Sequence, residues 1–251
     1  GVRACVKKGT FFDYLESQQP DVLFLQEIKV DEASLDPSMI DPRGYSSVWV
    51  SAKRKGYSGV ALLTRIKPRD VMMGFGIDRY DDEGRVVGAE FDDFFAFGVY
   101  FPNGQRDDER LNYKLDFYRD FFDYCADLNQ QTGKDILICG DYNTAHKPID
   151  LARPKENENM SGFLPIEREW MDKIETDYGY VDTFRHFYSE PDRYSWWTYR
   201  ANARNRNVGW RIDYVWVMGS FISKVKDAYI LDQIRGSDHC PVGVILDSKV
   251  K

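Results

Sequence analysis

The sequence predicts a mixed α/β fold, because apolar runs typical of buried strands recur along the chain and one long segment has helical periodicity. The 251 residues are 43% hydrophobic and 15% aromatic, which is enough apolar side chain to bury a sizeable core. No period of roughly 20 to 50 residues repeats, and the ten prolines are scattered without forming a linker. We therefore expect one domain over residues 1–251.

The N-terminal segment predicts a short helix followed by a buried strand. Residues 9–20 place apolar side chains at helical spacing, with Thr10 as a possible N-cap and a proline at the end. The run DVLFLQE at 21–27 is apolar until its last two residues, which is typical of a central strand. Such a strand would deliver Gln26 and Glu27 to a site at its C-terminal end.

The middle of the chain predicts more strands and one long helix. The next strands are expected at 45–52, 58–64, 85–91 and 94–101. Asp92 and Asp93 form a tight hairpin turn between the last two. Apolar residues recur at three- and four-residue steps over 107–131, which predicts the longest helix, and Gly133 ends it.

The C-terminal half predicts strands with polar residues beside them. ILIC at 136–139 leads directly into GDYNTAH, the pattern of a buried strand that ends in polar groups. The segments 210–217 and 241–247 are also expected to be strands. Polar side chains therefore gather at strand ends and in loops.

Composition and charge narrow the class of protein. Lysine and arginine total 34 against 41 for aspartate and glutamate, a net charge of −7, so nucleic acid would have to bind a local basic patch. The apolar runs stop far short of the roughly 20 residues that span a bilayer, so we expect a soluble protein with no membrane partner. Four cysteines lie far apart without a CxxC motif, which favours free thiols in a reducing cytosolic compartment.

Four acids lie beside or within strongly apolar strands: Glu27, Asp141, Asp213 and Asp238. A buried carboxylate is costly unless it is paired, protonated or bound to a metal. Their neighbours are oxygen and amide groups such as Asn143, which favours a hard ion, Mg²⁺ or Mn²⁺, over zinc. Any one of these acids could instead satisfy a backbone turn or a buried arginine.

Histidine chemistry has three candidates in the sequence. Asp238 and His239 are adjacent and would point apart in an extended chain, so a remote acid must orient the imidazole. Asp213 is the candidate, because a carboxylate on one ring nitrogen leaves the other free for a phosphate or a water. His146 follows GDYNTA and could support the site from behind, whereas His186 is expected to be a packing or surface residue.

Two basic runs stand out on this acidic chain. Residues 193–211 hold five arginines and no acid, interleaved with tyrosine and tryptophan, and residues 51–69 hold six basic residues and no acid. Arginine pairs with phosphate and aromatic rings stack on bases or line a pocket for an extruded sugar, so both runs favour a nucleic-acid surface. The alternative is a solvated face with the aromatic rings in the core.

Eight motifs occur in an order and spacing that match one family: LQEIK (25–29), YSGVALLTR (57–65), EGRVVGAEF (83–91), YFPNG (100–104), CGDYNTAH (139–146), GFLPIEREW (162–170), NVGWRIDY (207–214) and GSDHCPV (236–242). Over essentially its whole length the chain resembles the exonuclease III family of apurinic/apyrimidinic (AP) endonucleases, in the endonuclease/exonuclease/phosphatase superfamily. The resemblance implies a DNase I-like, four-layered α/β sandwich in which two packed mixed β-sheets are flanked by helices.

The resemblance also implies roles for individual residues. Glu27 matches a metal-binding glutamate, Asp141 an aspartate that activates or orients the attacking water, and His239 a histidine that touches the phosphate. The implied catalytic residues are Tyr100, Asp141, Asn143, Asp213 and His239. The implied metal ligands are Glu27, Asp238, Asp141 and Asn143. The implied DNA-binding residues are Arg3, Tyr57, Asn103, Arg106, Asn157, Trp196, Arg200 and Trp210.

Two departures from the family pattern are visible. Relatives begin with a strand that ends in a motif like SWNVNG, and this sequence starts where that motif would end, so we expect that a first strand has been trimmed from it. Arg200 stands where some relatives carry an apolar wedge, and it could fill the same gap and pair with phosphate.

The implied activity is Mg²⁺-dependent hydrolysis of the phosphodiester 5′ to an abasic site in double-stranded DNA, with Mn²⁺ as a possible substitute. Trimming of blocked 3′ ends and 3′-5′ exonuclease action would use the same site. The alternatives are a 3′-5′ exonuclease specialist, a DNase I-like nuclease or lipid phosphodiesterase of the superfamily, and a DNA-binding module that has lost catalysis. We expect a monomer that is cytoplasmic and associated with the nucleoid, or nuclear in a eukaryote.

Overall fold

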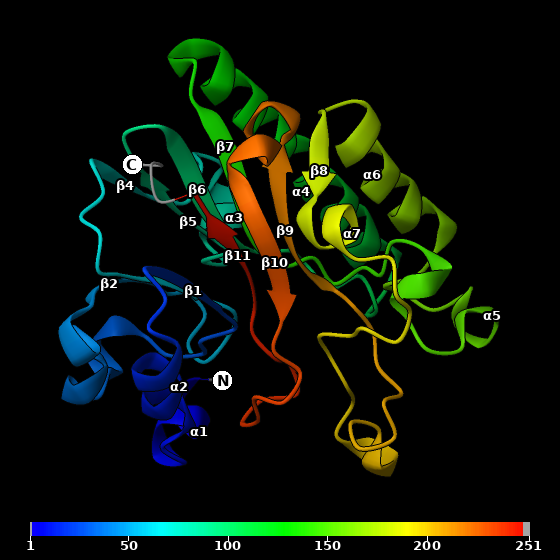
Figure 1. The fold of residues 1–251 in the computed structure, drawn as a ribbon, viewed down its shortest axis with the longest axis horizontal. Coiled ribbons are helices and arrows are strands. Elements are labelled where there is room, and N and C mark those ends of the chain that lie inside the picture. The colour runs from blue at the N-terminus through cyan, green and yellow to red at the C-terminus, as the bar shows by residue number, and fades with distance from the viewer. Residues whose placement is uncertain (1, 248–251) are drawn as a thin grey trace.

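The computed structural model describes residues 2–247, which form four layers in the order helix, sheet, sheet, helix (Figure 1). This architecture confirms the predicted α/β sandwich. Of the helices within the described range, none has the length and apolar character that a bilayer crossing requires.

A six-stranded mixed sheet forms one of the two central layers. Only β6 and β7 run parallel in it, because the long helix α4 (Asp108–Thr132) returns the chain to the same edge; the other neighbours are antiparallel. In spatial order its strands are β4 (Asp70–Met73), β5 (Val86–Glu90), β6 (Phe94–Tyr100), β7 (Asp135–Asp141), β9 (Asp213–Met218) and β8 (Tyr180–Asp182).

The second sheet layer is divided into two antiparallel parts. They are β1 (Val22–Gln26), β3 (Val60–Thr64) and β2 (Ser46–Val50) in one, and β10 (Val225–Ile230) and β11 (Val242–Leu246) in the other. β1 packs over β6 and β7, and β11 packs over β9. Within residues 2–247, β1 pairs only with β3 and β11 only with β10. Apolar side chains such as Leu62, Val87 and Val215 fill the space between the layers.

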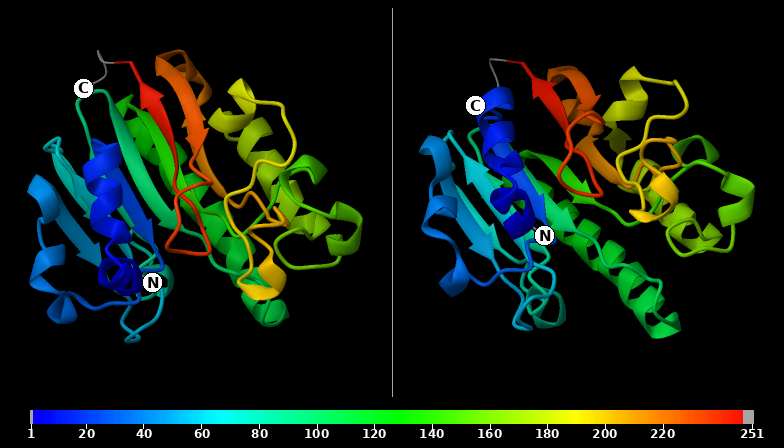
Figure 2. Two further views of the ribbon diagram at one scale, coloured as in Figure 1. Left: turned by 60° about the horizontal axis from the view of Figure 1, so that its bottom comes forward. Right: turned by 90° about the horizontal axis from the view of Figure 1, so that it is seen from below.

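Helices cover both outer faces of the sandwich. α1 (Val2–Lys7) and α2 (Thr10–Gln18) pack on the sheet of β1, β2 and β3, and α4 with α6 (Pro165–Thr176) packs on the six-stranded sheet (Figure 2). The short helices are α3 (Asp78–Asp81), α5 (Pro154–Asn157) and α7 (Thr183–Phe187).

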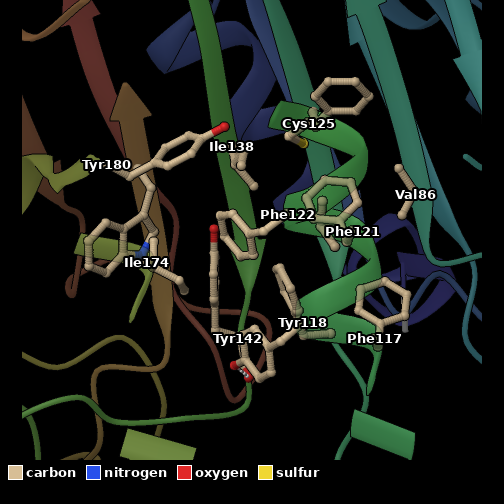
Figure 3. Packing of buried hydrophobic residues seen from close by; sticks show 14 of the residues in the cluster. Val86, Phe117, Tyr118, Phe121, Phe122, Cys125, Ile138, Tyr142, Ile174 and Tyr180 are labelled. Atoms are coloured by element: carbon tan, nitrogen blue, oxygen red, sulfur yellow. Dashed lines mark hydrogen bonds between the residues drawn. The ribbon is translucent and has the colours of Figure 1, made fainter. Parts of the chain in front are cut away.

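Aromatic side chains of α4 build the core beneath the six-stranded sheet. Phe117, Tyr118, Phe121 and Phe122 lie on one face of α4 and are fully buried, with Tyr142 among them (Figure 3). Burial of each side chain of this size contributes roughly 2–3 kcal/mol. This rigid core holds the end of β7, where the candidate site begins.

The strand and helix predictions are largely confirmed. Each predicted strand has a counterpart, the long helix is α4 with Gly133 as its left-handed C-cap, and all four cysteines are free. Two details were wrong. Gly9, with φ of 79°, takes the N-cap position of α2 and Thr10 is its first residue. The strand predicted at 210–217 begins only at Asp213, because Trp210 instead forms isolated bridges with Leu151 and Trp196. The prediction that a further strand precedes Gly1 stays a prediction.

Candidate active site

Three neighbouring strands place three predicted catalytic side chains side by side. Tyr100 at the end of β6 is the register partner of Asp141 at the end of β7, and Asp141 is the register partner of Asp213 at the start of β9. β6 and β7 end here while the antiparallel β9 begins here, so all three functional groups lie at one edge of the sheet. The sheet therefore fixes the spacing of this row.

Asp213 binds the imidazole of His239. The Nδ1 atom of His239 lies 2.9 Å from Oδ2 and 3.1 Å from Oδ1 of Asp213, and its Nε2 lies 4.0 Å from Asp141. A carboxylate on Nδ1 fixes the tautomer and directs Nε2 toward the row of strand ends. Burial disfavours the charged imidazole, but the Asp213 carboxylate outweighs that effect and holds the pKa of His239 above its usual value.

Ser195 binds the same carboxylate oxygen of Asp213 that His239 contacts most closely. Its hydroxyl donates to Oδ2 of Asp213 at 2.6 Å and accepts the backbone N–H groups of Ile212 and Asp213, both at 3.1 Å. Ser195 is completely buried. The carboxylate of Asp213 is therefore oriented by hydrogen bonds to both Ser195 and His239.

Asp141 occupies a buried position between other charges. Burial and the nearby Asp213 carboxylate raise the pKa of Asp141 to about 7, although His239 acts in the opposite direction. A carboxyl group with such a pKa exchanges its proton readily near neutral pH. Its Oδ1 accepts the backbone N–H of Asn143 at 2.8 Å, which orients the second oxygen for other partners.

Asn143 is held in a strained turn after β7. Its φ is 51°, an uncommon left-handed conformation for a residue other than glycine. The side-chain amide donates to the Phe101 carbonyl at 2.9 Å and accepts from Asn103 at 3.1 Å. Lys114 Nζ donates to the Asn143 carbonyl at 2.8 Å. Three elements therefore fix the position of Asn143, and Asn103 lies beside it.

Glu27 and Tyr100 line a cavity of about 480 Å³ next to this row. Glu27 is half-exposed, and its carboxylate accepts Lys29 Nζ at 2.6 Å. Burial, Asp141 and Glu27 together raise the pKa of Tyr100 well above its usual value, so its phenol remains a hydrogen-bond donor at neutral pH. Tyr100 thus lies near both carboxylates that the resemblance assigns to catalysis and metal binding, Asp141 and Glu27.

Asp238 has partners different from those of His239. Its Oδ2 accepts the indole N–H of Trp196 at 3.3 Å and its Oδ1 accepts the hydroxyl of Ser237 at 3.1 Å. Asp238 and His239, although adjacent in the chain, therefore bind different side chains. Asp238 connects the Asp213–His239 pair to the aromatic corner described next.

Two tryptophans form an aromatic corner beside His239. The rings of Trp196 and Trp210 are perpendicular with centroids 6.4 Å apart, and Phe163 lies 6.4 Å from Trp210 on its other side. A Cβ at Gly162 would approach the Trp210 ring to 3.2 Å, so the main chain packs closely against it. Asn157 ends α5 and donates to the carbonyls of Ala152 and Arg153.

The remaining predicted DNA contacts differ in exposure. Arg3, Arg106 and Arg200 are exposed on loops and the first helix; Arg106 pairs with Asp107 at 2.7 Å. Tyr57 is half-buried, and its hydroxyl accepts Arg85 at 3.0 Å and Arg110 at 2.9 Å. Arg85 also donates to the Tyr100 carbonyl at 2.8 Å, so Tyr57 and Tyr100 share one buried guanidinium.

The arginine-rich run 193–211 is only partly a surface. Arg211 is buried and pairs with Asp150 and Asp182, and Arg204 donates to three loop carbonyls. Trp197 is core. The interpretation of all five arginines as a nucleic-acid surface was therefore wrong for two of them, because distant acids and carbonyls in the fold supply their partners.

The second basic run, 51–69, does not form one patch. The strand β3 separates it, so that Lys53, Arg54 and Lys55 precede one end and the other three basic residues follow the opposite end. Arg65 pairs with Asp21, and Arg69 pairs with Asp92. Only the first group lies beside the cavity at Tyr100, which Arg54 lines.

The other two histidines lie outside the row. His146 is buried, and its Nε2 lies 2.8 Å from Asp172. Burial lowers the pKa of His146. His186 is exposed beside Phe187, as expected for a surface residue.

Sequence reasoning missed four buried residues that position the site: Ser195, Lys114, Glu167 and Arg85. Lys114 and Glu167 form an ion pair at 2.6 Å with both side chains completely buried. Glu167 also accepts the backbone N–H groups of Gly162 and Leu164. Glu167 and Arg85 belong to motifs quoted above, so their occurrence in GFLPIEREW and EGRVVGAEF is the signal that could have found them.

The donor set fits a hard divalent cation. Asp141, Asp213 and His239 each present a ligand atom, and these atoms lie within 4.8 Å of one another. The carboxylates of Asp141 and Asp213 are almost fully buried and repel each other, which raises the pKa of Asp141 and which a cation would relieve. Further oxygen atoms come from Glu27, which lines the cavity at Tyr100, and from Asn143, whose backbone N–H binds Asp141.

Comparison with known proteins finds relatives that match nearly the whole chain. The Endonuclease/Exonuclease/phosphatase family model matches residues 4–239. An exodeoxyribonuclease of Bacillus subtilis is 41% identical over 248 residues, covering 98% of this chain and 96% of the relative. A DNA-(apurinic or apyrimidinic site) endonuclease of Dictyostelium discoideum is 38% identical over 251 residues, covering 98% and 68%. The 3′-5′ exonuclease NExo of Neisseria meningitidis superimposes with a TM-score of 0.89 at 27% identity, covering 98% and 96%.

Proposed function

Because the chain belongs to the Endonuclease/Exonuclease/phosphatase family, we propose that it is a DNA repair nuclease that hydrolyses the phosphodiester 5′ to an abasic site in duplex DNA. The observation that carries this proposal is the register of Tyr100, Asp141 and Asp213 across three strands, with His239 bound to Asp213. That row offers a proton acceptor and several hydrogen-bond donors to one phosphate.

The chain's own residues provide the proton transfer and the charge stabilisation. The oxygen of the water forms a bond to phosphorus and the bond from phosphorus to the 3′ oxygen breaks. The leaving oxygen takes up a proton from solvent, which replaces the one removed from the water, and becomes a 3′-hydroxyl that a polymerase can extend. Asp141 takes the proton of the attacking water, because its carboxyl group titrates near neutral pH, whereas the raised pKa of His239 keeps its imidazole protonated as a hydrogen-bond donor to the phosphate. The side chains of Asn143 and Tyr100 are positioned in advance to donate hydrogen bonds to the phosphate oxygens. Asn103, which is hydrogen-bonded to Asn143, is a third such donor.

Metal dependence is a property of nucleases in this family, and we propose Mg²⁺ as the ion, with Mn²⁺ as a substitute. Glu27, Asp141, Asn143 and Asp238 would hold it. When bound, the ion would neutralise negative charge on the phosphate and on the leaving oxygen. The mutual repulsion of Asp141 and Asp213 supports a cation at this position.

Selection of abasic sites would come from the aromatic corner. A sugar without its base costs less to extrude from the duplex than a complete nucleotide. The perpendicular rings of Trp196 and Trp210 form two walls against which such a sugar could pack, and Asn157 lies at the end of the neighbouring α5. Arg106 and Arg200 are exposed, and we propose that they reach the duplex, for which Arg106 would give up its pair with Asp107.

A 3′-5′ exonuclease specialist is the second candidate function. The high structural similarity to an exonuclease of Neisseria meningitidis favours it. Removal of a 3′ nucleotide or a blocking group breaks the same kind of bond and would use the same residues. We propose that the protein acts as a monomer where its DNA substrate lies, in the nucleoid or the nucleus.

The first test is a duplex with one tetrahydrofuran abasic analogue, incubated with Mg²⁺ or with chelator. We expect one Mg²⁺-dependent nick 5′ to the analogue, and this analogue excludes β-elimination. The Asp141→Asn variant should lower the rate by at least roughly a thousandfold while DNA affinity stays nearly unchanged, because Asp141 acts on the transition state. Digestion from the 3′ ends without a nick would favour the exonuclease. Absence of both reactions would contradict the proposed function.

A further inference from the structure

A second cluster of metal-ligating side chains lies at α6 and shares no residue with the catalytic row. It consists of His146, from the loop after β7, and of Asp172 and Glu175 from α6, the helix labelled in Figure 1. One ligand atom of each residue lies within 4.8 Å of the other two. Asp172 and Glu175 are three residues apart, so one face of the helix presents both carboxylates to the imidazole. We call this group the α6 cluster.

His146 is held in place by the surrounding fold. Its side chain is almost completely buried, and Nε2 lies 2.8 Å from Oδ1 of Asp172. Its backbone N–H donates to the hydroxyl of Tyr214 at 3.1 Å, and its carbonyl accepts Nε of Arg168 at 3.0 Å. Burial lowers the pKa of His146, so the ring is neutral near pH 7. A neutral ring can carry its one proton on Nδ1 and leave the lone pair of Nε2 for a metal.

The two carboxylates have oxygen atoms that are not used by the fold. Glu175 forms no hydrogen bond or ion pair with another residue between positions 2 and 247. Oδ1 of Asp172 accepts both His146 and Lys147, whereas Oδ2 has no hydrogen-bond partner in the part of the chain that the structure describes. Partial burial raises the pKa of Glu175. A cation would therefore find unpaired carboxylate oxygens beside a fixed imidazole.

We propose that the α6 cluster binds one divalent cation of the Zn²⁺ class, with His146, Asp172 and Glu175 as its ligands. One imidazole nitrogen and two carboxylate oxygens form a donor set that Zn²⁺ accepts, whereas Mg²⁺ prefers oxygen ligands alone. The ion joins α6 to the loop after β7, which also carries Asn143. This site is independent of the proposed nuclease function, because it uses none of the residues that act on DNA there.

Lys147 competes with the cation for Asp172. The two side chains form an ion pair, and both are about half exposed. Removal of the ammonium group would free Asp172 and take away a positive charge that repels a metal ion. Removal of the Glu175 carboxylate would take away a ligand. The proposal therefore predicts opposite effects for two substitutions of exposed side chains, neither of which disturbs the core.

Titration calorimetry with Zn²⁺ on the whole protein, stripped of metal by chelator, tests the site. For Glu175→Gln we expect the loss of one bound ion or an affinity for it at least about tenfold lower. Lys147→Gln should raise the affinity for the same ion roughly three- to tenfold. Glu169→Gln is the matched control, because Glu169 is exposed on the same helix and pairs with Lys173. Asp141→Asn should weaken only the ion at the catalytic row.

Thermal unfolding gives a second readout. It is measured in the Asp141→Asn variant, so that the catalytic row contributes less to metal binding. Zn²⁺ at about a hundred times its Kd should raise the Tm by roughly 5–10 °C. Adding Glu175→Gln should remove most of this rise, and adding Glu169→Gln should not. Glu175 is preferred to His146 for substitution because its side chain is exposed, so its loss leaves the fold intact.

These measurements decide the proposal separately from the proposed function. If Glu175→Gln binds Zn²⁺ as Glu169→Gln does, or if Lys147→Gln weakens the binding, the α6 cluster is not a cation site, whatever the protein does to DNA. If abasic DNA is not nicked and Glu175→Gln still loses an ion, the site stands in a protein with another activity. Nicking in Mg²⁺ should be unchanged in Glu175→Gln, since Glu175 lies outside the catalytic row.

Discussion

Ser195 shows how one hydroxyl group can orient the Asp213–His239 pair. Its hydroxyl donates to Oδ2 of Asp213, which His239 also contacts, and it accepts two backbone N–H groups. Hydrogen bonds to charged groups contribute roughly 1.5–3 kcal/mol. Loss of the hydroxyl would free Asp213 to rotate, and His239 would lose its fixed orientation with it.

We therefore predict that Ser195→Ala lowers kcat by roughly 10- to 100-fold with little change in KM, because the affected interaction acts mainly in the transition state. Ser195→Thr keeps the hydroxyl and should recover most of the activity. The measurement is steady-state nicking of the tetrahydrofuran duplex. Thr183→Val is the matched control, because its buried hydroxyl donates to the Val215 carbonyl of the same strand, away from the carboxylates. An unchanged kcat in Ser195→Ala would show that Asp213 needs no support.

Single residues of the site were predictable where a sequence motif marked them. Asp213 and His239 were proposed as partners from adjacent polar groups beside apolar strands, and the structure places them 2.9 Å apart. Ser195 was not predictable, since nothing in YSWW distinguishes a buried serine that bonds a carboxylate 18 residues later. Its role depends on the pairing of Trp196 with Trp210, a long-range contact without a local sequence signal.

At the scale of elements, a buried ion pair joins α4 to the start of α6 and to the turn after β7. Lys114 of α4 donates to Glu167 of α6 and to the Asn143 carbonyl. Burial lowers the pKa of Lys114, although Glu167 opposes this effect. Glu167 in turn fixes Gly162 against Trp210. The pair thus links Asn143 to the aromatic corner.

We predict that Lys114→Met costs about 3–5 kcal/mol of unfolding free energy, because it leaves the Glu167 carboxylate buried without its counter-charge. Lys173→Met is the control: Lys173 pairs with Glu169 on the exposed face of α6, and such pairs contribute at most about 1 kcal/mol. Urea unfolding of both variants gives the comparison. If both variants lose the same unfolding free energy, the backbone N–H groups that Glu167 accepts are sufficient to stabilise its buried carboxylate without Lys114.

Elements were predictable to different degrees. Strands with continuous apolar runs, such as β1 and β7, and the amphipathic α4 were confirmed because their pattern is local. β8 and α6 were not predicted. β8 has three residues, too few for a periodic signal. α6 begins with a proline and carries charged residues on its exposed face, so its apolar stripe is narrow.

At the scale of the whole molecule, the acidic composition conceals how charge is distributed. The net charge is −7, yet several arginines serve the interior. Arg211, completely buried, pairs with Asp150 and Asp182, and Arg185 also pairs with Asp150. This network joins the loop after β7 to α7 and to the segment before β9. A charge count cannot separate such arginines from those that face DNA, because only the fold decides which cations find acids.

Asp150 makes the stability of the molecule depend on pH. Despite burial, Arg211 and Arg185 lower the pKa of Asp150 from 3.8 to about 2. Because the pKa is lower in the folded state, this group stabilises the fold fully above about pH 4, and the contribution disappears as pH falls toward 2. The whole difference corresponds to roughly 2 kcal/mol.

We predict that Asp150→Asn is less stable than the wild type at pH 6, because Arg211 stays buried without one of its two acids. Between pH 6 and pH 3, however, the variant should lose about 1 kcal/mol less stability than the wild type, since it lacks the titrating carboxyl. Urea unfolding at both pH values measures the two losses. The exposed pair of Lys226 with Asp247 supplies the control, and Lys226→Met should leave the pH dependence nearly unchanged. A parallel loss in Asp150→Asn and wild type would show that other carboxylates set the acid limit of the fold.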